Sequence, residues 1–249
     1  MRVAVLFSGG KDSSLCIWRL KSMGHEVACL VSAIPRRDDS YMFHIPNVSL
    51  TRVQAGCMCI PWEGIPVSGE KEVEVSELAA AIPALQAQHG FDAMAAGAIA
   101  SRYQRERIEA LCASSGLRAV FPMWQEDEES LLREICALGF EVYFTSVAAE
   151  GLGPEWLGRR LDLRAVRDLL RLRERFRINV SGEGGEYETF VSDMPLFQRR
   201  INVTTAEFSW VRSSGTMRIT GFALEEKRPS SLSSGARESS GGDDKEIPF

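Results

Sequence analysis

Short apolar runs alternate with longer amphipathic segments along the first half of the chain. Five of the runs have the length of buried strands and are rich in β-branched or small residues, and the segments between them repeat apolar positions with a helical period. The expected strands are residues 2–7, 26–33, 64–68, 92–98 and 117–121. The expected helices are residues 13–23, 50–60, 75–90 and 103–115. This alternation predicts an α/β fold, in which a five-stranded parallel doubly wound sheet carries helices on both faces.

The pattern changes after residue 124 and predicts a smaller C-terminal α+β domain. Helical periodicity covers residues 128–138 and 163–176, and strand-like runs cover residues 140–146, 199–211 and 217–224. We therefore expect two domains, residues 1–124 and 125–224. Residues 225–249 hold Ser and Gly clusters with almost no apolar residues, which predicts a disordered tail.

The composition narrows the setting in which the chain works. Its 249 residues contain no apolar run near the ~18–20 residues that span a bilayer. The first apolar run is too short for a secretory signal. We therefore expect a cytoplasmic protein without a membrane partner. The net charge of −5 argues against direct nucleic-acid binding by bulk charge. Six scattered cysteines and only three histidines favour reduced, buried thiols over a structural zinc site.

The loop SGGKDS joins the first expected strand to the first expected helix. Gly9 and Gly10 let the backbone approach a ligand without a Cβ in the way, and the loop delivers its amides to a helix start, where the helix dipole favours an anion. Lys11 adds a positive charge, and Ser8 and Ser13 add hydroxyl donors. These residues predict a phosphate-binding loop.

Asp12 is unusual in a plain anion site, because its carboxylate repels phosphate. An acid at this position is consistent with a Mg²⁺ ion that bridges the phosphates, so Asp12 is the predicted metal ligand and ATP with Mg²⁺ is the predicted cofactor pair. The spacing matches neither the Walker A loop nor G-x-G-x-x-G. It resembles the PP-loop of the N-type ATP pyrophosphatases, a family with a HUP-like core. That resemblance implies a grip on the β- and γ-phosphates, attack on the α-phosphate, an adenylated intermediate and release of pyrophosphate.

Four further stretches of sequence narrow the resemblance to one family within this superfamily. They read SYMFHIPN (40–47), GAIASRYQRERIE (97–109), PMWQEDEESLLREI (122–135) and GEGGEYETFVSDMPLF (182–197). Together with the loop they resemble the diphthine–ammonia ligase family over residues 1–224. The resemblance implies a ligase that activates the carboxylate of diphthine, a modified histidine on translation elongation factor 2, with ATP. Ammonia then displaces AMP and gives diphthamide.

The stretch GEGGEYET places three carboxylates around one aromatic ring. We expect Glu183 and Glu186 to be catalytic and also to bind substrate with Tyr187, because carboxylates and an aromatic face suit the trimethylammonium group of diphthine. A carboxylate is equally suited to bind the incoming ammonium and take its proton. The sequence does not divide these roles among Glu183, Glu186 and Glu188. An acidic turn on the surface is the simpler alternative.

Other candidates follow from the doubly wound arrangement and the resemblance. Ala33 and Gly97, at two strand ends, are expected to line the nucleotide site, and His44, Asn47 and Tyr103 are expected to contact the substrate. Residues 155–177 are rich in arginine, which indicates either a solvated face or a docking patch for an acidic partner or RNA.

Two other functions remain open at this point. The first is a PP-loop ligase with a different acceptor, either another acid such as a cobalamin-related metabolite or a tRNA base. Such a ligase uses the same loop. Glu188 stands where the cobalamin-linked relatives tend to carry histidine, which favours the diphthamide branch. A nucleotide-binding sensor or scaffold is the third candidate. The sequence predicts neither the ammonia source nor the oligomeric state.

Overall fold

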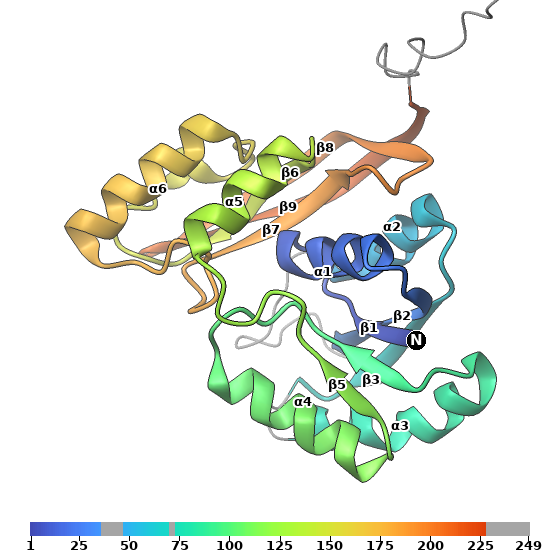
Figure 1. Ribbon diagram of the computed structural model, residues 1–249. Coiled ribbons are helices and arrows are strands. Elements are labelled where there is room, and N and C mark those ends of the chain that lie inside the picture. The colour runs from blue at the N-terminus through green and yellow to red at the C-terminus, as the bar shows by residue number, and fades with distance from the viewer. Residues whose placement is uncertain (36–46, 70–72, 228–249) are drawn as a thin grey trace, which may run out of the picture.

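The computed structural model describes residues 1–35, 47–69 and 73–227, and its first half contains the expected parallel sheet (Figure 1). The strand order is β3-β2-β1-β4-β5, and every neighbouring pair is parallel. The strands are β1 (Arg2–Leu6), β2 (Glu26–Pro35), β3 (Trp62–Val67), β4 (Ala93–Ala95) and β5 (Arg118–Val120). This order places β1 and β4 side by side at the centre, and the predicted α/β fold is confirmed.

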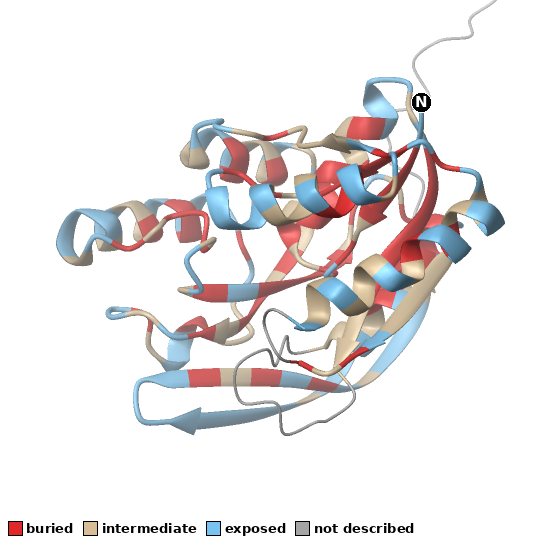
Figure 2. Cartoon of the chain, turned by 90° about the horizontal axis from the view of Figure 1, so that it is seen from below, coloured by how far each residue is buried: buried red, intermediate tan, exposed pale blue. Residues whose placement is uncertain are grey.

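Helices cover both faces of this sheet. They are α1 (Lys11–Ser22), α2 (Thr51–Met58), α3 (Val73–His89) and α4 (Arg102–Ser114), with a short 3-10 turn, η1 (Val48–Leu50), before α2. Val3 and Val5 pack with α1 and α2, whereas Ala4 packs with α3 and α4, as expected for side chains that alternate along a strand. Figure 2 shows the result, with buried strands between helices that expose their outer faces.

The second half forms a four-stranded antiparallel sheet in the order β7-β6-β9-β8. Its strands are β6 (Glu141–Val147), β7 (Tyr187–Asp193), β8 (Arg199–Val211) and β9 (Ser214–Glu226), and its helices are α5 (Glu128–Ala137), α6 (Leu163–Phe176) and the short η2 (Pro154–Trp156). In Figure 1 this sheet lies between α5 and α6 on one side and α1 and α2 on the other. α1 contacts β7 and α2 contacts β8, so the two sheets share one helical layer.

One hydrophobic core runs through both halves. Its largest cluster joins Leu15 and Ile17 of α1 to Phe144 and Phe190 of the second sheet. Arg19 of α1 adds a polar link, because its guanidinium donates to the Pro122 carbonyl (3.1 Å) and pairs with Glu126, just before α5, and with Glu134 of α5. The predicted boundary after residue 124 falls inside this shared region.

The structure differs from the expected elements at three places that matter later. α1 begins at Lys11, two residues earlier than expected, with Gly10 as an N-cap that makes no side-chain hydrogen bond. β7 is a strand that the sequence does not predict, because Glu188 and the two glutamates just before it resemble an acidic turn. β9 continues to Glu226, so the expected tail does not begin at residue 225; residues 228–249 lie outside the described part of the chain.

Among the described residues, no helix combines the length and the apolar character that a bilayer-crossing segment needs.

Candidate active site

The predicted phosphate-binding loop is the connection between β1 and α1. Gly9 is left-handed, with a φ of +80°, and a Cβ there would lie 2.3 Å from the Gln54 Oε1 atom, so glycine is the residue that fits. The Gly10 carbonyl accepts a hydrogen bond from the Ser13 hydroxyl (3.1 Å), which lies 3.2 Å from the Ser8 hydroxyl. The structure therefore gathers these residues at the start of α1, where first-turn amides and the helix dipole favour an anion.

The Lys11 side chain points into the protein and is only 3% exposed. Its ammonium donates to the Asp12 carboxylate (2.7 Å) and to the Ser181 main-chain carbonyl, and it lies 5.1 Å from the centre of the Tyr187 ring. Its main-chain amide donates to the Thr189 hydroxyl at 3.1 Å. Lys11 thus connects the loop to the C-terminal half through both its backbone and its side chain.

β7 lies directly against the loop. The Val191 amide donates to the Gly9 carbonyl (3.1 Å), and the fully buried Gln54 amide donates to the Gly9 carbonyl (2.9 Å) and the Val191 carbonyl (2.7 Å). Sequence reasoning missed Gln54, Ser181 and Thr189. A glutamine on the buried face of an expected helix was a usable signal for Gln54, whereas nothing in the local sequence announces a main-chain carbonyl partner.

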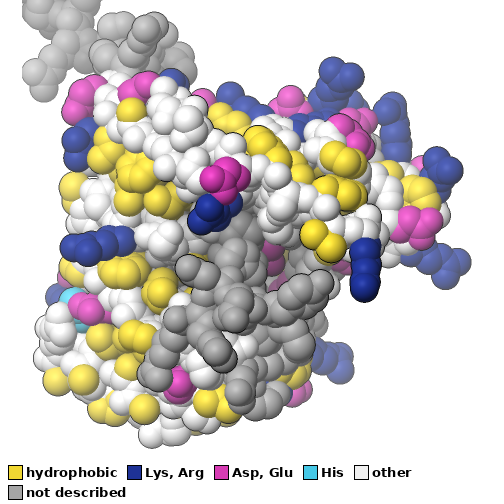
Figure 3. Space-filling view, turned by 180° about the vertical axis from the view of Figure 1, so that it is seen from behind, with side chains coloured by type: hydrophobic (Ala, Val, Ile, Leu, Met, Phe, Trp, Pro, Cys, Tyr) yellow, Lys and Arg dark blue, Asp and Glu magenta, His cyan; other side chains and the backbone are white. Residues whose placement is uncertain are grey.

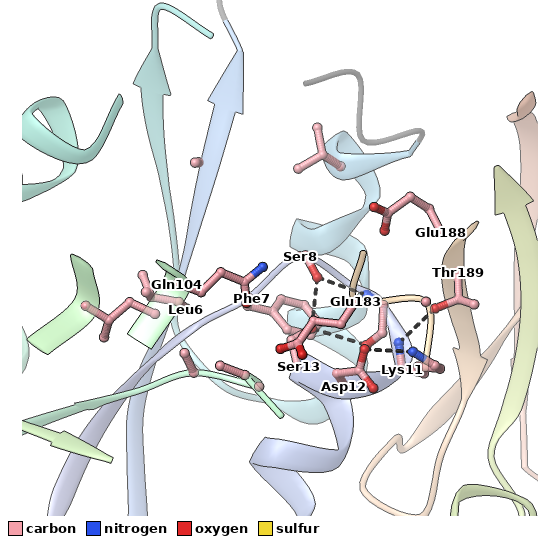
Figure 4. A pocket seen from close by; sticks show the side chains of 18 of the residues that line it. Leu6, Phe7, Ser8, Lys11, Asp12, Ser13, Gln104, Glu183, Glu188 and Thr189 are labelled. Atoms are coloured by element: carbon pink, nitrogen blue, oxygen red, sulfur yellow. Dashed lines mark hydrogen bonds and ion pairs between the residues drawn. The ribbon is translucent and has the colours of Figure 1, made fainter. Parts of the chain in front are cut away.

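A cavity of about 340 Å³ opens beside the loop, within the size range of small-molecule sites (Figure 4). One part of its wall is apolar and comes from the parallel-sheet half: Leu6, Phe7, Val31, Ala33, Val48, Leu78, Ala96, Ala98 and Ile108. The rest is glycine or polar and comes from the loop, from the β4–α4 connection and α4, from the turn of residues 179–186 (the Gly182 turn), and from the start of β7: Ser8, Gly10, Lys11, Asp12, Ser13, Gly97, Gln104, Gly182, Glu183, Tyr187, Glu188 and Thr189. The two halves of the chain therefore share one cavity.

Gly97 brings the β4–α4 connection into contact with the loop. A Cβ on Gly97 would lie 2.7 Å from the Asp12 carbonyl carbon and 2.8 Å from the Ser13 nitrogen, so no side chain fits. Gly97 and Ala33 both line the cavity. Their predicted contact with a nucleotide stays a prediction.

Glu183 holds the same connection from the other side. Its two carboxylate oxygens accept hydrogen bonds from the main-chain amides of Ile99 and Ala100, both at 2.8 Å. A carboxylate that binds two amides is well satisfied and is fixed in position. Glu183 lines the cavity, and its geometry suits positioning of the site; its predicted catalytic role stays a prediction.

Glu186 does not line the cavity. Its Oε1 atom accepts from the Asn179 amide (3.0 Å), and its Oε2 atom is buried without a hydrogen-bond partner among the described residues. This hydrogen bond closes the turn of residues 179–186, which includes Ser181, the residue whose carbonyl binds Lys11. The predicted catalytic and substrate-binding roles of Glu186 gain no support from this geometry and stay predictions.

Glu188, to which the sequence assigns no separate role, lines the cavity. Figure 4 shows its carboxylate on the wall of the cavity, close to the loop. Protein atoms that crowd the cavity wall raise the pKa of Glu188 to about 7; the nearby Lys11 charge acts in the opposite direction, and the Asp12 charge raises the pKa further. Glu188 is nevertheless an exposed residue, so solvent reaches its carboxylate.

Tyr187 is buried behind the cavity wall. Its hydroxyl donates to the Val180 carbonyl (2.7 Å), and its ring packs against Phe144 with 4.9 Å between ring centres. Burial holds the pKa of the Tyr187 phenol well above its ordinary value. Only part of the ring reaches the cavity, beside the Lys11 ammonium.

Two of the remaining substrate-binding candidates, Asn47 and Tyr103, do not line the cavity. Asn47 pairs its side-chain amide with the main chain of β9, donating to the Met217 carbonyl (3.1 Å) and accepting from the Ile219 amide (2.7 Å). Tyr103 lies on the exposed side of α4 under the Arg107 guanidinium. His44 lies outside the described residues. Their proposed contacts with substrate stay predictions.

The residues around the loop suit a metal ion that arrives with phosphates. Within the described ranges, no group of three or more His, Cys, Asp or Glu side chains is placed to hold a metal by itself. Asp12 is the one carboxylate of the loop, and it lines the cavity together with Glu183 and Glu188. Mg²⁺ is commonly held by one or two carboxylates together with substrate phosphate oxygens, so this donor set fits. Burial raises the pKa of Asp12, and the Lys11 ammonium opposes that shift.

Two family models match the chain. The diphthamide synthase N-terminal domain matches residues 1–119, and the diphthamide synthase C-terminal domain matches residues 127–224. The cavity described above is built from both matched segments.

Curated relatives cover most of the chain. A rat protein named diphthine–ammonia ligase is 33% identical over 252 residues, which is 91% of this chain and 94% of the rat protein. A human protein of the same name is 33% identical and covers 83% of this chain and 84% of the human protein. A fission-yeast (Schizosaccharomyces pombe) protein of that name is 35% identical, and the match spans 37% of its longer chain.

The chain also matches a solved structure. It is described as a predicted subunit of tRNA methyltransferase from Methanocaldococcus jannaschii and is 20% identical, and the match covers 78% of this chain and 98% of the solved chain. Its TM-score of 0.40 is too low to inform fold or function.

Proposed function

Because this chain belongs to the diphthamide synthase family, we propose that it is an ATP-dependent ligase that forms a C–N bond. The proposed acceptor is the carboxylate of diphthine on translation elongation factor 2, and the proposed nitrogen donor is ammonia. The reaction consumes ATP and yields diphthamide, AMP and pyrophosphate. This proposal places the reaction in the cytoplasm, where the factor works, and requires no direct contact with nucleic acid.

One observation carries the proposal: the loop and the segment 181–189, from the two matched family domains, line one cavity and bond directly to each other. The Lys11 amide bonds to Thr189, and the Lys11 ammonium bonds to Ser181. A phosphate-binding loop on its own leaves the acceptor undefined. The direct bonding supports an acceptor held by the C-terminal half beside the α-phosphate.

In the proposed first step, an acceptor carboxylate oxygen attacks the α-phosphorus, and the bond to the pyrophosphate leaving group breaks. The apolar part of the cavity takes the base and ribose, and the loop amides with Lys11 stabilise the charge that builds on pyrophosphate. Asp12 would hold Mg²⁺ together with phosphate oxygens, and the ion would neutralise phosphate charge there. Glu183 keeps the β4–α4 connection against the loop, so that the cavity has its shape before the nucleotide arrives.

The test is an assay with purified components. The protein is mixed with ATP, Mg²⁺, ammonium and elongation factor 2 that carries diphthine, and the factor is weighed by mass spectrometry while the nucleotides are separated. The expected result is a carboxylate-to-amide mass change with stoichiometric AMP and pyrophosphate. Formation of ADP, or no change in the factor alongside an active family member, would overturn the proposal. AMP formation with another acid or with tRNA would identify the alternative acceptor.

A lysine pair provides the control. Lys11→Met removes the charge in the loop and is expected to lower the rate by about a hundredfold or more, in the range seen when one electrostatic donor is lost. Lys21→Met, at the exposed end of the same helix, is expected to leave the rate unchanged.

A further inference from the structure

Glu188 faces the cavity without a partner, unlike the other two glutamates of its motif. In the described part of the chain its carboxylate has no hydrogen bond or ion pair, whereas the Glu183 and Glu186 carboxylates bind main-chain amides. We propose that Glu188 binds the incoming ammonium and accepts its proton as the nitrogen attacks the acyl-adenylate. This inference rests on the proposed function and assigns one of its steps to a residue.

The surroundings of Glu188 suit a small cation that must lose a proton. Two charged groups act on it from the start of α1: Lys11 stabilises the carboxylate, and Asp12 destabilises it. The crowded wall raises the pKa of Glu188 to about 7, so near neutral pH the group both accepts and releases a proton readily. Across the cavity, Leu78, Ile108 and Gln104 carry no charge that would compete for the cation.

The chemistry requires such a group. Ammonium has no lone pair and cannot attack a carbonyl until one proton leaves it. When Glu188 takes that proton, the nitrogen lone pair forms the C–N bond, and the acyl–oxygen bond to AMP breaks with its electron pair going to the phosphate oxygen. After the C–N bond forms, the nitrogen still carries three hydrogens and a positive charge, so a second proton passes to solvent through the open cavity. The products are the neutral amide, AMP and two protons, which balances the step.

The other glutamates are poorly placed for this task. Both Glu183 oxygens already accept hydrogen bonds from the main-chain amides of Ile99 and Ala100. Glu186 lies off the cavity wall. A competing role for Glu188 is to bind the trimethylammonium group of the acceptor, and an experiment that separates the two half-reactions decides between these roles.

The experiment measures adenylation and amide formation separately in full-length protein. Exchange of labelled pyrophosphate into ATP, with the diphthine-bearing factor and no ammonium, reports adenylation. Mass change of the factor with ammonium reports the complete reaction. Glu188→Gln is expected to keep exchange within about twofold of wild type and to lower amide formation by about a hundredfold or more. Glu207→Gln, on the β8 strand away from the cavity, is the matched control and is expected to change neither.

Two further arms sharpen the result. Hydroxylamine is largely uncharged near neutral pH and needs no base to expose its lone pair, so it should form the hydroxamate with Glu188→Gln at close to the wild-type rate. Glu188→Asp keeps a carboxylate and should recover part of the ammonium-dependent rate.

Each outcome is informative. Normal amide formation by Glu188→Gln would overturn the inference while leaving the proposed function intact. A raised KM for the factor in the exchange reaction would overturn it in favour of trimethylammonium binding. Absence of exchange in the wild-type protein would overturn the proposed function, and the inference with it.

Discussion

Gly97 lies where the β4–α4 connection contacts the backbone of the phosphate-binding loop. The space left there for a side chain is smaller than a methyl group. The Cβ of an alanine would lie 2.7–2.8 Å from main-chain atoms of Asp12 and Ser13, and backbone atoms cannot move aside as a flexible side chain does. An alanine would therefore push the β4–α4 connection away from the phosphate-binding loop.

We expect Gly97→Ala to weaken binding of a non-hydrolysable ATP analogue by about tenfold or more, since a displacement that costs about 1–3 kcal/mol falls on the site itself. Isothermal titration calorimetry measures the affinity of each variant for the analogue. Gly56→Ala is the control, because a Cβ there meets nothing within 4 Å and the residue lies inside α2. Unchanged affinity in Gly97→Ala would show that the connection moves freely.

Glu188 also links the site to stability through pH. Its pKa is raised from 4.5 to about 7 in the folded protein, so between those values the folded state holds a proton that the unfolded state has lost. The stability from this group is complete below about pH 4.5 and declines as the pH rises towards about 7.

Glu188→Gln removes that decline. We expect the variant to gain stability relative to wild type at about pH 8 and to show no such gain at about pH 4.5, as measured by urea unfolding at both values. The same stability difference at both pH values would contradict the raised pKa.

At the scale of elements, α6 presents one stripe of arginines. Arg164, Arg167, Arg171 and Arg175 are exposed and spaced so that they share one side of the helix, opposite the buried Ala165, Val166 and Leu169. Figure 3 shows Lys and Arg side chains gathered along the edge of the molecule that carries α6. Their concentration on a chain with a net charge of −5 favours an acidic docking partner.

We expect the double change Arg164→Glu and Arg167→Glu to raise the KM for the protein substrate by about tenfold at low salt with little change in kcat, and the effect to shrink as salt is added. Arg118→Glu, at the start of β5, is the control for an exposed arginine outside the stripe. An unchanged KM would assign the stripe to solvation alone.

At the scale of the whole molecule, the two halves share a core and a site. Leu15 and Phe190 belong to one cluster, and the Gly9 carbonyl and the Lys11 amide find their partners on β7. A fragment that ends at residue 124 loses those partners and exposes the apolar face of α1.

We therefore expect the full chain to unfold in a single calorimetric transition, and the fragment of residues 1–124 to lose measurable ATP-analogue binding. The control is the same fragment supplied with the purified second half. Two separate transitions, or a fragment that binds as the full chain does, would show that the halves are independent.

The sequence predicted the sheet, the loop and the family, because each depends on a local pattern. Strand and helix periods predict the sheet, glycines at a tight turn predict the loop, and short sequence motifs indicate the family. The separate roles of the glutamates depend on contacts between residues that lie 80 or more positions apart in the sequence. Glu183 reaches Ile99 and Ala100, and Gln54 reaches Val191. No periodicity encodes such contacts, so the sequence ranked Glu183 and Glu186 above Glu188.

The hydrogen bonds between the loop and β7 also limit how the protein could be rebuilt. A designer who wished to give this ATP-binding half a new acceptor would be tempted to exchange the C-terminal half as a module. The exchange would remove the Thr189 hydroxyl, the Val191 amide and the Ser181 carbonyl, and with them the partners of Lys11 and Gly9. A working graft has to carry those three groups across, so this enzyme is better redesigned by changing side chains on the Gly182 turn than by transplanting the domain that bears it.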